Sequence, residues 1–255
     1  MHPGEYEVMS RVEGDHWWYR GLRDCLERTL RSRDLSPPPG PRVLDAGCGT
    51  GANLLLLRDL LRPSHLEGFD AAEEALALAH AKVPEAELYR GDICAPEVRS
   101  APLDLIVSLD VIYIPGAQRA RDGLRTLVGA LRPGGLFVVN LPAYDWLYSE
   151  HDVAIHTSER YTAPRVRRLL GDIGLEVALL TYRVCLLFPL VVMTRLPGML
   201  RARPGDPEAR SDLHQPPAPR LDRGLHAVLR AENRLIAAGV RLPWGSSIFA
   251  VGRKP

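Results

Sequence analysis

The chain has 255 residues, of which 46% are hydrophobic, so it can bury a substantial core as one large domain or as a domain with a sizeable insertion. Its formal net charge is +1, and it has no long basic stripe and no target-reading module, which argues against a nucleic-acid partner. Four cysteines lie far apart without a CxxC pair, which argues against a disulfide framework and a structural zinc site, so no metal is expected.

The start of the chain, MHPGEYEVMS, has no basic segment followed by an apolar run, so no secretory signal is expected and a cytoplasmic location is predicted.

The first predicted element is a helix over residues 5–33, with a break near Gly14. The helix carries one apolar stripe at spacings of three and four residues, made of Trp18, Leu22, Cys25, Leu26 and Leu30. The proline-rich segment at 34–41 ends the helix and forms a linker.

Short apolar runs then alternate with helical patterns. The expected strands are RVLDAG, HLEGFD, AELYRGD, LDLIVSLDV and LFVVNLP, and the expected helices lie in GANLLLLRDLLR, AAEEALALAHAK and GAQRARDGLRTLVGALRPGG. Strands separated by helices of this length predict right-handed crossovers and a parallel sheet with helices on both faces. The expected fold class is therefore a doubly wound, Rossmann-like α/β sheet.

The C-terminal part changes character. A helix in TAPRVRRLLGDIG, a strand in LEVALLTYR and a closing strand in SSIFAVGRK are expected, the last one antiparallel. Between these two strands lie residues 184–245, which are too many for a hairpin and predict a helical cap. The predicted division is an N-terminal helical lid at 1–38, a core at 39–183 and 246–255, and a cap at 184–245.

The cap region is apolar and basic. Its stretch VCLLFPLVVM, at residues 184–193, contains a proline and is about half as long as a membrane span, so no transmembrane helix is predicted. The stretch either buries itself as core, lines a site for a hydrophobic substrate, or forms a dimer or membrane contact. Residues 160–255 carry 16 basic and 7 acidic groups, which can face an anionic partner or pair with the acidic N-terminal part. A monomer and a homodimer both remain open.

A glycine-rich loop, VLDAGCGTGAN at residues 43–53, joins the first core strand to the first core helix. Glycine is needed where the backbone turns tightly and touches a ligand, and ligands of such sheets bind at the carboxyl ends of the strands. Taken alone, Gly47, Gly49 and Ala52 also fit a dinucleotide-binding pattern.

Three carboxylates decide against a dinucleotide. Asp45 directly precedes the loop, where it would repel a pyrophosphate and suit a cationic ligand. Asp70 ends the second strand, in the right place to accept hydrogen bonds from both ribose hydroxyls. Asp92 follows the third strand and can take an adenine amino group.

The core resembles the class I S-adenosylmethionine-dependent methyltransferases. The pieces that carry the resemblance are VLDAGCGTG, GFD (68–70), GDI (91–93), LDLIVSLDV (103–111) and LRPGGLFVV (131–139), which occur in this order. The resemblance implies S-adenosylmethionine as cofactor and S-adenosylhomocysteine as product. By this resemblance Asp45, Gly47, Cys48, Gly49 and Gly51 hold the methionine part, Asp70 the ribose, Asp92 and Ile93 the adenine, and Ser108, Leu109 and Asp110 line the pocket floor.

Residues 140–162 are the predicted acceptor side. Methyl transfer depends mainly on alignment and on exclusion of water, and it needs a base only if the acceptor must lose a proton. His151 or His156 can act as that base, with Asp152 orienting either one. Arg160 can bind a carboxylate or phosphate. The other predicted substrate contacts in this segment are Tyr144, Trp146 and Tyr161.

The segments HWWYRGLR and LPWGSSIFAVGRKP resemble a narrower bacterial branch of this superfamily, whose members accompany glycan, lipid or secondary-metabolite biosynthesis. One departure concerns the position after the fourth strand. Many relatives have an acidic residue and a histidine there, whereas this chain has Tyr113 and Ile114. A base is therefore not expected at this position, and Tyr113 can pack against an apolar acceptor that has an acidic group.

The predicted lid explains the adjacent tryptophans near the start of the chain. Trp17, Trp18 and Tyr19 would cover adenosine and substrate, and Arg20 or Arg23 would meet the methionine carboxylate or Asp45. The alternative is a helix held to the body by ordinary hydrophobic packing.

The predicted function is methyl transfer from S-adenosylmethionine to a small molecule. An alternative is a cyclase or isomerase that binds S-adenosylmethionine without transferring its methyl group, because a glycine loop reports binding rather than transfer.

Overall fold

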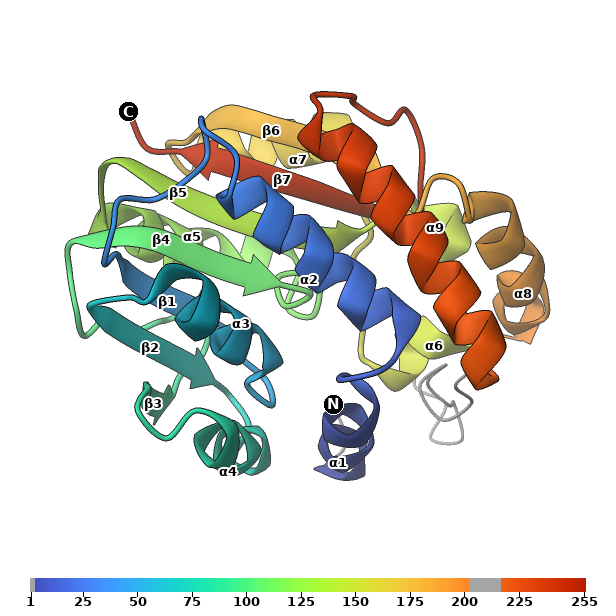
Figure 1. The fold of residues 1–255 in the computed structure, drawn as a ribbon, viewed down its shortest axis with the longest axis horizontal. Helices are drawn as coiled ribbons and strands as arrows, with labels where there is room; N and C mark the ends of the chain where they lie inside the picture. Colours follow the sequence, from blue (N-terminus) through green and yellow to red (C-terminus); the bar gives the residue numbers. More distant parts are fainter. Residues whose placement is uncertain (1–2, 202–216) are drawn as a thin grey trace.

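The computed structural model describes residues 3–201 and 217–255, and its centre is a seven-stranded sheet with the order β3-β2-β1-β4-β5-β7-β6 (Figure 1). β7 is antiparallel to both of its neighbours, and the other neighbouring pairs are parallel. The predicted fold class is thereby confirmed. The strands are β1 (Arg42–Ala46), β2 (His65–Asp70), β3 (Glu87–Arg90), β4 (Leu103–Leu109), β5 (Leu131–Pro142), β6 (Glu176–Arg183) and β7 (Ser247–Arg253).

β5 differs from its prediction at its start, which lies at Leu131 rather than at Leu136. Leu131 pairs with Leu103, and the register then shifts so that Leu136 pairs with Leu105. The Pro-Gly-Gly sequence that suggested a turn is therefore accommodated as an irregularity inside the ladder, where Gly134 has a φ of +79°.

Helices cover both faces of the sheet. α2 (Trp17–Leu30), α3 (Ala52–Leu61) and α9 (Pro219–Ala237) lie over one face, and α5 (Ala117–Ala130) and α7 (Ala163–Asp172) lie over the other (Figure 1). The remaining helices border the carboxyl ends of the strands or the cap. They are α1 (Pro3–Val12), α4 (Glu73–Lys82), the short η1 (Asp145–Leu147), α6 (Glu150–Ala154) and α8 (Phe188–Arg201).

The N-terminal helix is broken where the sequence predicted, since α1 ends at Val12 and α2 begins at Trp17. Helix α2 packs along α9. Four residues of its predicted apolar stripe are buried, namely Leu22, Cys25, Leu26 and Leu30. Gly21 permits this close approach, because a Cβ there would overlap the Leu229 side chain of α9. Asn233 of α9 adds hydrogen bonds from Nδ2 to the Gly21 carbonyl and to Asp24 Oδ2, both 2.8 Å long.

The predicted cap contributes α8 and α9, while its segment 202–216 lies outside the described residues. In the part of the chain that the structure describes, no helix combines the length and apolar character needed to cross a bilayer.

Candidate active site

The carboxyl ends of β1, β2, β4, β5 and β6 meet at one edge of the sheet. β5 and β6 both pair antiparallel with β7, so they run in the same direction as the other four strands. The strand order changes direction between β1 and β4, which is where sheets of this type bind ligands. The glycine loop therefore lies at the expected crevice.

The glycine loop uses conformations that favour glycine. Gly47, Gly49 and Gly51 have φ values of +86°, +52° and +88°. A Cβ on Gly47 would overlap the methyl groups of Val111, and one on Gly51 would lie 2.8 Å from the Ala79 Cα. The loop is thus packed tightly against its neighbours at both ends, and its middle residue, Gly49, presents backbone without a side chain.

Asp45 is a buried carboxyl group without a partner among the described residues. It is 0% exposed, and neither carboxyl oxygen accepts a hydrogen bond. Burial, with a further contribution from the charge of Asp70, raises the pKa of Asp45 to about 8. A buried polar group without a partner costs about 1–3 kcal/mol, so the position is suited to a ligand ammonium group. The residues present therefore fit the methionine end of S-adenosylmethionine.

Asp70 is held by the backbone. Its Oδ2 accepts the Gly49 N–H at 2.9 Å and its Oδ1 accepts the Ala72 N–H at 3.0 Å. Burial nevertheless raises the pKa of Asp70. The carboxylate is fixed beside the glycine loop, as the ribose-binding prediction requires. Asp92 is exposed and accepts the Cys94 N–H at 2.9 Å, while Ile93 is buried beneath it.

The three residues predicted for the pocket floor have different surroundings. Ser108 is buried, and its Oγ donates to the Ala46 carbonyl at 2.9 Å, so it ties β4 to β1. Leu109 is part of the hydrophobic core. Asp110 is half-buried, so it is the one of these three residues that is partly accessible at the carboxyl edge of the sheet.

Asp110 begins a chain of polar contacts that links the ends of β4, β5 and β6. Its φ is +60°, its N–H donates to the Asn140 carbonyl at 3.1 Å, and its Oδ1 accepts from Asn140 Nδ2 at 2.9 Å. Arg183, at the end of β6, donates from Nη1 to Asn140 Oδ1 at 3.3 Å. Burial raises the pKa of Asp110 to about 7, although the Asn140 bond and Arg183 act in the opposite direction.

Neither Asn140 nor Arg183 was predicted as a functional residue. Arg183 is 0% exposed, and its Nε and Nη2 have no hydrogen-bond partner among the described residues. The one signal in the sequence was an arginine at a buried position of an otherwise apolar strand. That signal names no partner, because Asn140 is far away along the chain.

Comparison with known proteins agrees with this geometry. Residues 43–135 match the family described as "Methyltransferase domain". The matched region contains the glycine loop, Asp45, Asp70 and Asp110, so this part of the chain is similar to methyltransferase domains.

Two curated relatives extend the likeness of this domain. A Mycolicibacterium smegmatis protein named "Probable S-adenosylmethionine-dependent methyltransferase" is 28% identical over 68% of this chain and 65% of its own length. A trans-aconitate 2-methyltransferase from Acidovorax sp. (strain JS42) is 30% identical over 56% of this chain and 51% of its own length. The chain thus spans between about half and two thirds of the length of these relatives.

One solved structure resembles the fold over the whole chain. It is a Haloferax volcanii protein in complex with the Trm112 methyltransferase activator, with a TM-score of 0.62 and 20% identity, and the match covers 100% of this chain and 98% of that one. At this level of identity the likeness concerns the fold alone.

Helix α1 covers the glycine loop. The Met9 Cε lies 3.3 Å from where a Gly49 Cβ would stand. Tyr6 of α1 lies close enough to Asp70 and Glu74 for their charges to act on it, and burial together with these charges raises the pKa of Tyr6 to about 12. The sequence had assigned the cover to Trp17 and its neighbours, so these α1 residues were missed.

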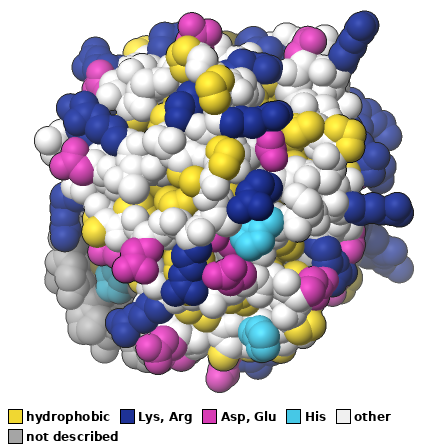
Figure 2. Space-filling model, turned by 90° about the vertical axis from the view of Figure 1, so that its left-hand side faces the viewer, with side chains coloured by type: hydrophobic (Ala, Val, Ile, Leu, Met, Phe, Trp, Pro, Cys, Tyr) yellow, Lys and Arg dark blue, Asp and Glu magenta, His cyan; other side chains and the backbone are white. Residues whose placement is uncertain are grey.

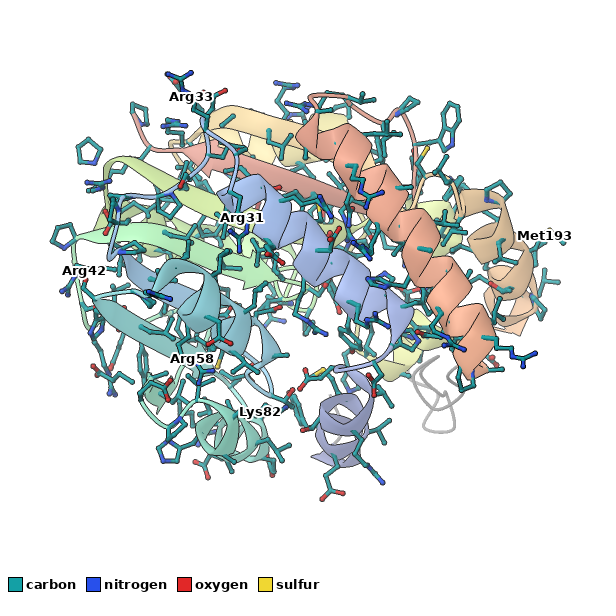
Figure 3. The ribbon with its side chains drawn as sticks, viewed as in Figure 1. Arg31, Arg33, Arg42, Arg58, Lys82 and Met193 are labelled. Atoms are coloured by element: carbon teal, nitrogen blue, oxygen red, sulfur yellow. The ribbon has the colours of Figure 1, made fainter. Side chains whose placement is uncertain are left out.

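A polar cluster connects α1 to α4 and to the glycine loop. Glu13 is 6% exposed, accepts the Thr50 hydroxyl at 2.7 Å and forms an ion pair with Lys82. Lys82 also donates to Ser10 Oγ and to the Thr50 carbonyl, both at 2.9 Å. In Figure 3 the Lys82 side chain extends from α4 toward α1.

The predicted lid residues on α2 have other partners. Trp17 and Trp18 pack against a cluster of Val184, Leu187 and Leu229 from the cap, so they contribute to hydrophobic packing. The Trp17 N–H donates to Asp222 Oδ1 at 2.8 Å. Tyr19 lies close enough to Tyr113 for its charge to affect the pKa of that residue.

The expected contact of Arg20 or Arg23 with Asp45 is wrong. Arg20 lies 3.8 Å from Asp222, and Arg23 donates to the Glu13 carbonyl. A carboxylate lies nearer to Arg20, and a backbone carbonyl accepts from Arg23. Their predicted contact with the methionine carboxylate stays a prediction.

The acceptor-side loop is organised around a buried ion pair. Arg160 Nη1 lies 2.5 Å from Asp152 Oδ1, and the residues are 2% and 1% exposed. Arg160 Nε also donates to the carbonyls of Ala143 and Tyr144. Burial would raise the pKa of Asp152, but the guanidinium of Arg160 holds it below its usual value.

One prediction for this loop is corrected by that pair. Arg160 is not presented to an acceptor, because its guanidinium binds Asp152 and the backbone. Asp152 also accepts the Ser149 N–H at Oδ2, at 3.0 Å, and His151 lies close enough for its charge to lower the pKa of Asp152. That Asp152 orients a histidine base stays a prediction. His156 is exposed and His151 is half-buried.

The aromatic residues of the loop form a stack. Tyr144 lies between Trp146 and Tyr182, with ring centroids 5.8 and 5.4 Å apart, and Trp146 remains 53% exposed. Tyr161 is buried and donates to Glu159. Tyr113, another predicted substrate residue, is buried near Asp110. Burial and the charge of Asp110 both raise the pKa of Tyr113.

Proposed function

We propose that the protein is a cytoplasmic methyltransferase that transfers a methyl group from S-adenosylmethionine to a small biosynthetic molecule by in-line displacement. The observation that carries the proposal is Asp45, a buried carboxyl group directly before the glycine loop, neither oxygen of which has a hydrogen-bond partner among the described residues. Asp70, fixed by the loop it borders, supports the same cofactor because it offers a carboxylate to two adjacent hydroxyls.

The cofactor, when bound, supplies a methyl group activated by a positively charged sulfur. The protein then has to bind the cofactor and the acceptor, align them, and exclude water from the site. Asp45 neutralises the ammonium group, Asp70 accepts from the ribose hydroxyls, and Asp92 with Ile93 contacts the adenine. Helix α1 closes the site over Gly49.

Asp110 is the proposed proton acceptor when the acceptor molecule must be deprotonated. Val111, its neighbour, packs against Gly47, so Asp110 lies beside the methionine end of the loop. Asn140 fixes one oxygen of the carboxyl group, and among the described residues no hydrogen bond reaches the other. A pKa of about 7 suits proton transfer at neutral pH. His151 and His156 remain the alternative bases.

The proposed acceptor is a small molecule with an acidic group. The basic C-terminal third and the buried guanidinium of Arg183 support an anionic acceptor. Because one relative is named trans-aconitate 2-methyltransferase, trans-aconitate is the first acceptor to test.

Titration calorimetry with S-adenosylhomocysteine tests the cofactor site. Asp70→Ala is expected to weaken binding by about 1–3 kcal/mol, because charge-assisted hydrogen bonds to the ribose are lost. Asp59→Asn is the matched control, since Asp59 pairs with Arg58 on the surface. No binding by the wild type, or equal binding by both variants, would contradict the proposal.

Transfer is tested with S-adenosylmethionine labelled in its methyl group, incubated with trans-aconitate and a panel of other acidic small molecules. The label is expected in the product. A converted acceptor without label would instead favour the cyclase or isomerase alternative.

A further inference from the structure

Helix α8 has two apolar faces, and the described protein covers one of them. Leu187 and Val191 pack in the cluster that includes Leu229 of α9. The other face carries four exposed apolar side chains at helical spacing. They are Leu190, Met193, Leu196 and Leu200, with exposed fractions of 43%, 68%, 47% and 86%.

The exposed apolar surface continues beyond α8. Leu186 is 53% exposed just before the helix, and the Trp146 ring lies 6.0 Å from the Phe188 ring at its first residue. Trp244 is 52% exposed, and its backbone reaches the Cys185 thiol. We call these residues the α8 patch: Trp146, Leu186, Leu190, Met193, Leu196, Leu200 and Trp244. They are seven of the ten large hydrophobic residues exposed in the described chain.

The exposed charges near the α8 patch are mainly basic. The exposed charged residues described between positions 184 and 245 are all arginines, and Arg220, Arg223 and Arg230 among them lie in the first two thirds of α9.

The acids in this part of the molecule are largely paired. Asp222 binds the Trp17 N–H and lies near Arg20, and Glu232 is buried on the amides of Val184 and Leu186. Asp145, which precedes Trp146, forms an ion pair with Arg165, and the Glu150 carboxylate lies beside Gly198 of α8.

The opposite side of the molecule is different. Figure 2 shows basic and acidic side chains interleaved over that side, with hydrophobic residues scattered among them. In Figure 3, Met193 lies at the far end of the molecule from this side and points outward. The apolar and basic character is therefore concentrated at one end.

We propose that the α8 patch docks on an anionic lipid surface. Large exposed apolar patches mark interaction sites, and a short helix with exposed leucines, flanking arginines and nearby tryptophans is suited to lie in a membrane interface. The leucines and Met193 enter the acyl boundary, the tryptophans lie at the headgroup level, and the arginines meet lipid phosphates. A second copy of this chain is a poorer occupant, since it would bring like charges together.

Co-sedimentation with vesicles tests this proposal. The wild-type protein is expected to sediment with vesicles of equal parts phosphatidylcholine and phosphatidylglycerol, and to bind phosphatidylcholine vesicles more weakly. Met193→Glu and Leu200→Glu are each expected to reduce the partition by about tenfold, because a charge replaces an inserted apolar side chain. High salt should also weaken binding.

Leu235→Glu is the matched control. Leu235 is 44% exposed in the last turns of α9, at the end of that helix away from α8 (Figure 1), so its substitution should leave vesicle binding unchanged. Thermal unfolding of each variant shows whether it is folded. No sedimentation of the wild type, or equal loss with Leu235→Glu, would overturn the proposal. So would a wild-type dimer, found by analytical ultracentrifugation, that Met193→Glu dissociates.

Discussion

The two halves of the sheet edge are built differently. The half at β1 and β2 takes its groups from a continuous loop and from the carboxylates that end neighbouring strands. The half at β4, β5 and β6 joins Asp110, Asn140 and Arg183, which are distant in sequence, and rests on the buried Asp152–Arg160 pair. A local motif can announce the first kind of site, whereas the second exists only after the strands have paired.

Removing Arg160 should affect stability most. Arg160→Met removes the nearer of the two arginines beside the buried Asp152 and leaves only Arg195, at 3.8 Å, so it is expected to lower the free energy of unfolding by about 3 kcal/mol. Urea denaturation measures this. In the double variant Asp152→Asn/Arg160→Met much of the loss should be recovered, because the buried carboxylate is removed together with its main partner. A loss below about 1 kcal/mol would mean that the acceptor-side loop does not depend on this pair.

Adding a side chain to the glycine loop should have the next largest effect on stability. Gly47→Ala combines an unfavourable positive φ with overlap against Val111, and it should destabilise the protein by about 2–4 kcal/mol. Gly129→Ala is its control, because Gly129 lies in α5 with no atom within 4 Å of the added Cβ. Similar melting temperatures for the two variants would show that the loop tolerates a side chain.

Protonation of Asp45 makes the stability of the folded protein depend on pH. The pKa of this group is about 8 in the folded protein and near 4 when unfolded, so the folded state binds the additional proton between these values. Without ligand, stability should therefore fall as the pH rises from about 4 to about 8, by at most about 1.4 kcal/mol per unit from this group.

The same group makes ligand binding depend on pH. The ammonium of S-adenosylhomocysteine favours ionised Asp45, so affinity should rise with pH up to about 8, and binding should release a proton. Calorimetry in buffers of different ionisation enthalpy measures that proton. Asp45→Asn should remove the proton release, and an unchanged release would assign it to another group.

Loosening α1 should have the smallest effect. Lys82→Met removes the hydrogen bonds to Ser10 and Thr50 and the ion pair with Glu13, and it should weaken S-adenosylhomocysteine binding by about 1 kcal/mol. Arg90→Met is the control, since the Arg90–Glu73 pair is exposed. Protease sensitivity near α1 should rise in Lys82→Met alone. Equal affinity and equal cleavage in both variants would leave α1 without a covering role.

The sequence by itself determined the alternation of strands and helices and the glycine loop. These features depend on residues close together in the chain, through hydrophobic periodicity and the backbone freedom of glycine. Asp45 and Asp70 could be named as candidates for the same reason, because each ends a strand next to the loop.

Only the tertiary structure decided what the remaining polar groups do. In the folded protein Arg160 pairs with Asp152, Asp45 has no hydrogen-bond partner among the described residues, and the sheet brings Arg183 to Asn140 and Asn140 to Asp110. The fold also places Met9 of α1 beside Gly49 and packs the tryptophans of α2 against the cap. A polar side chain takes its role from the groups that reach it once water is excluded, and the order of residues along the chain does not contain that information.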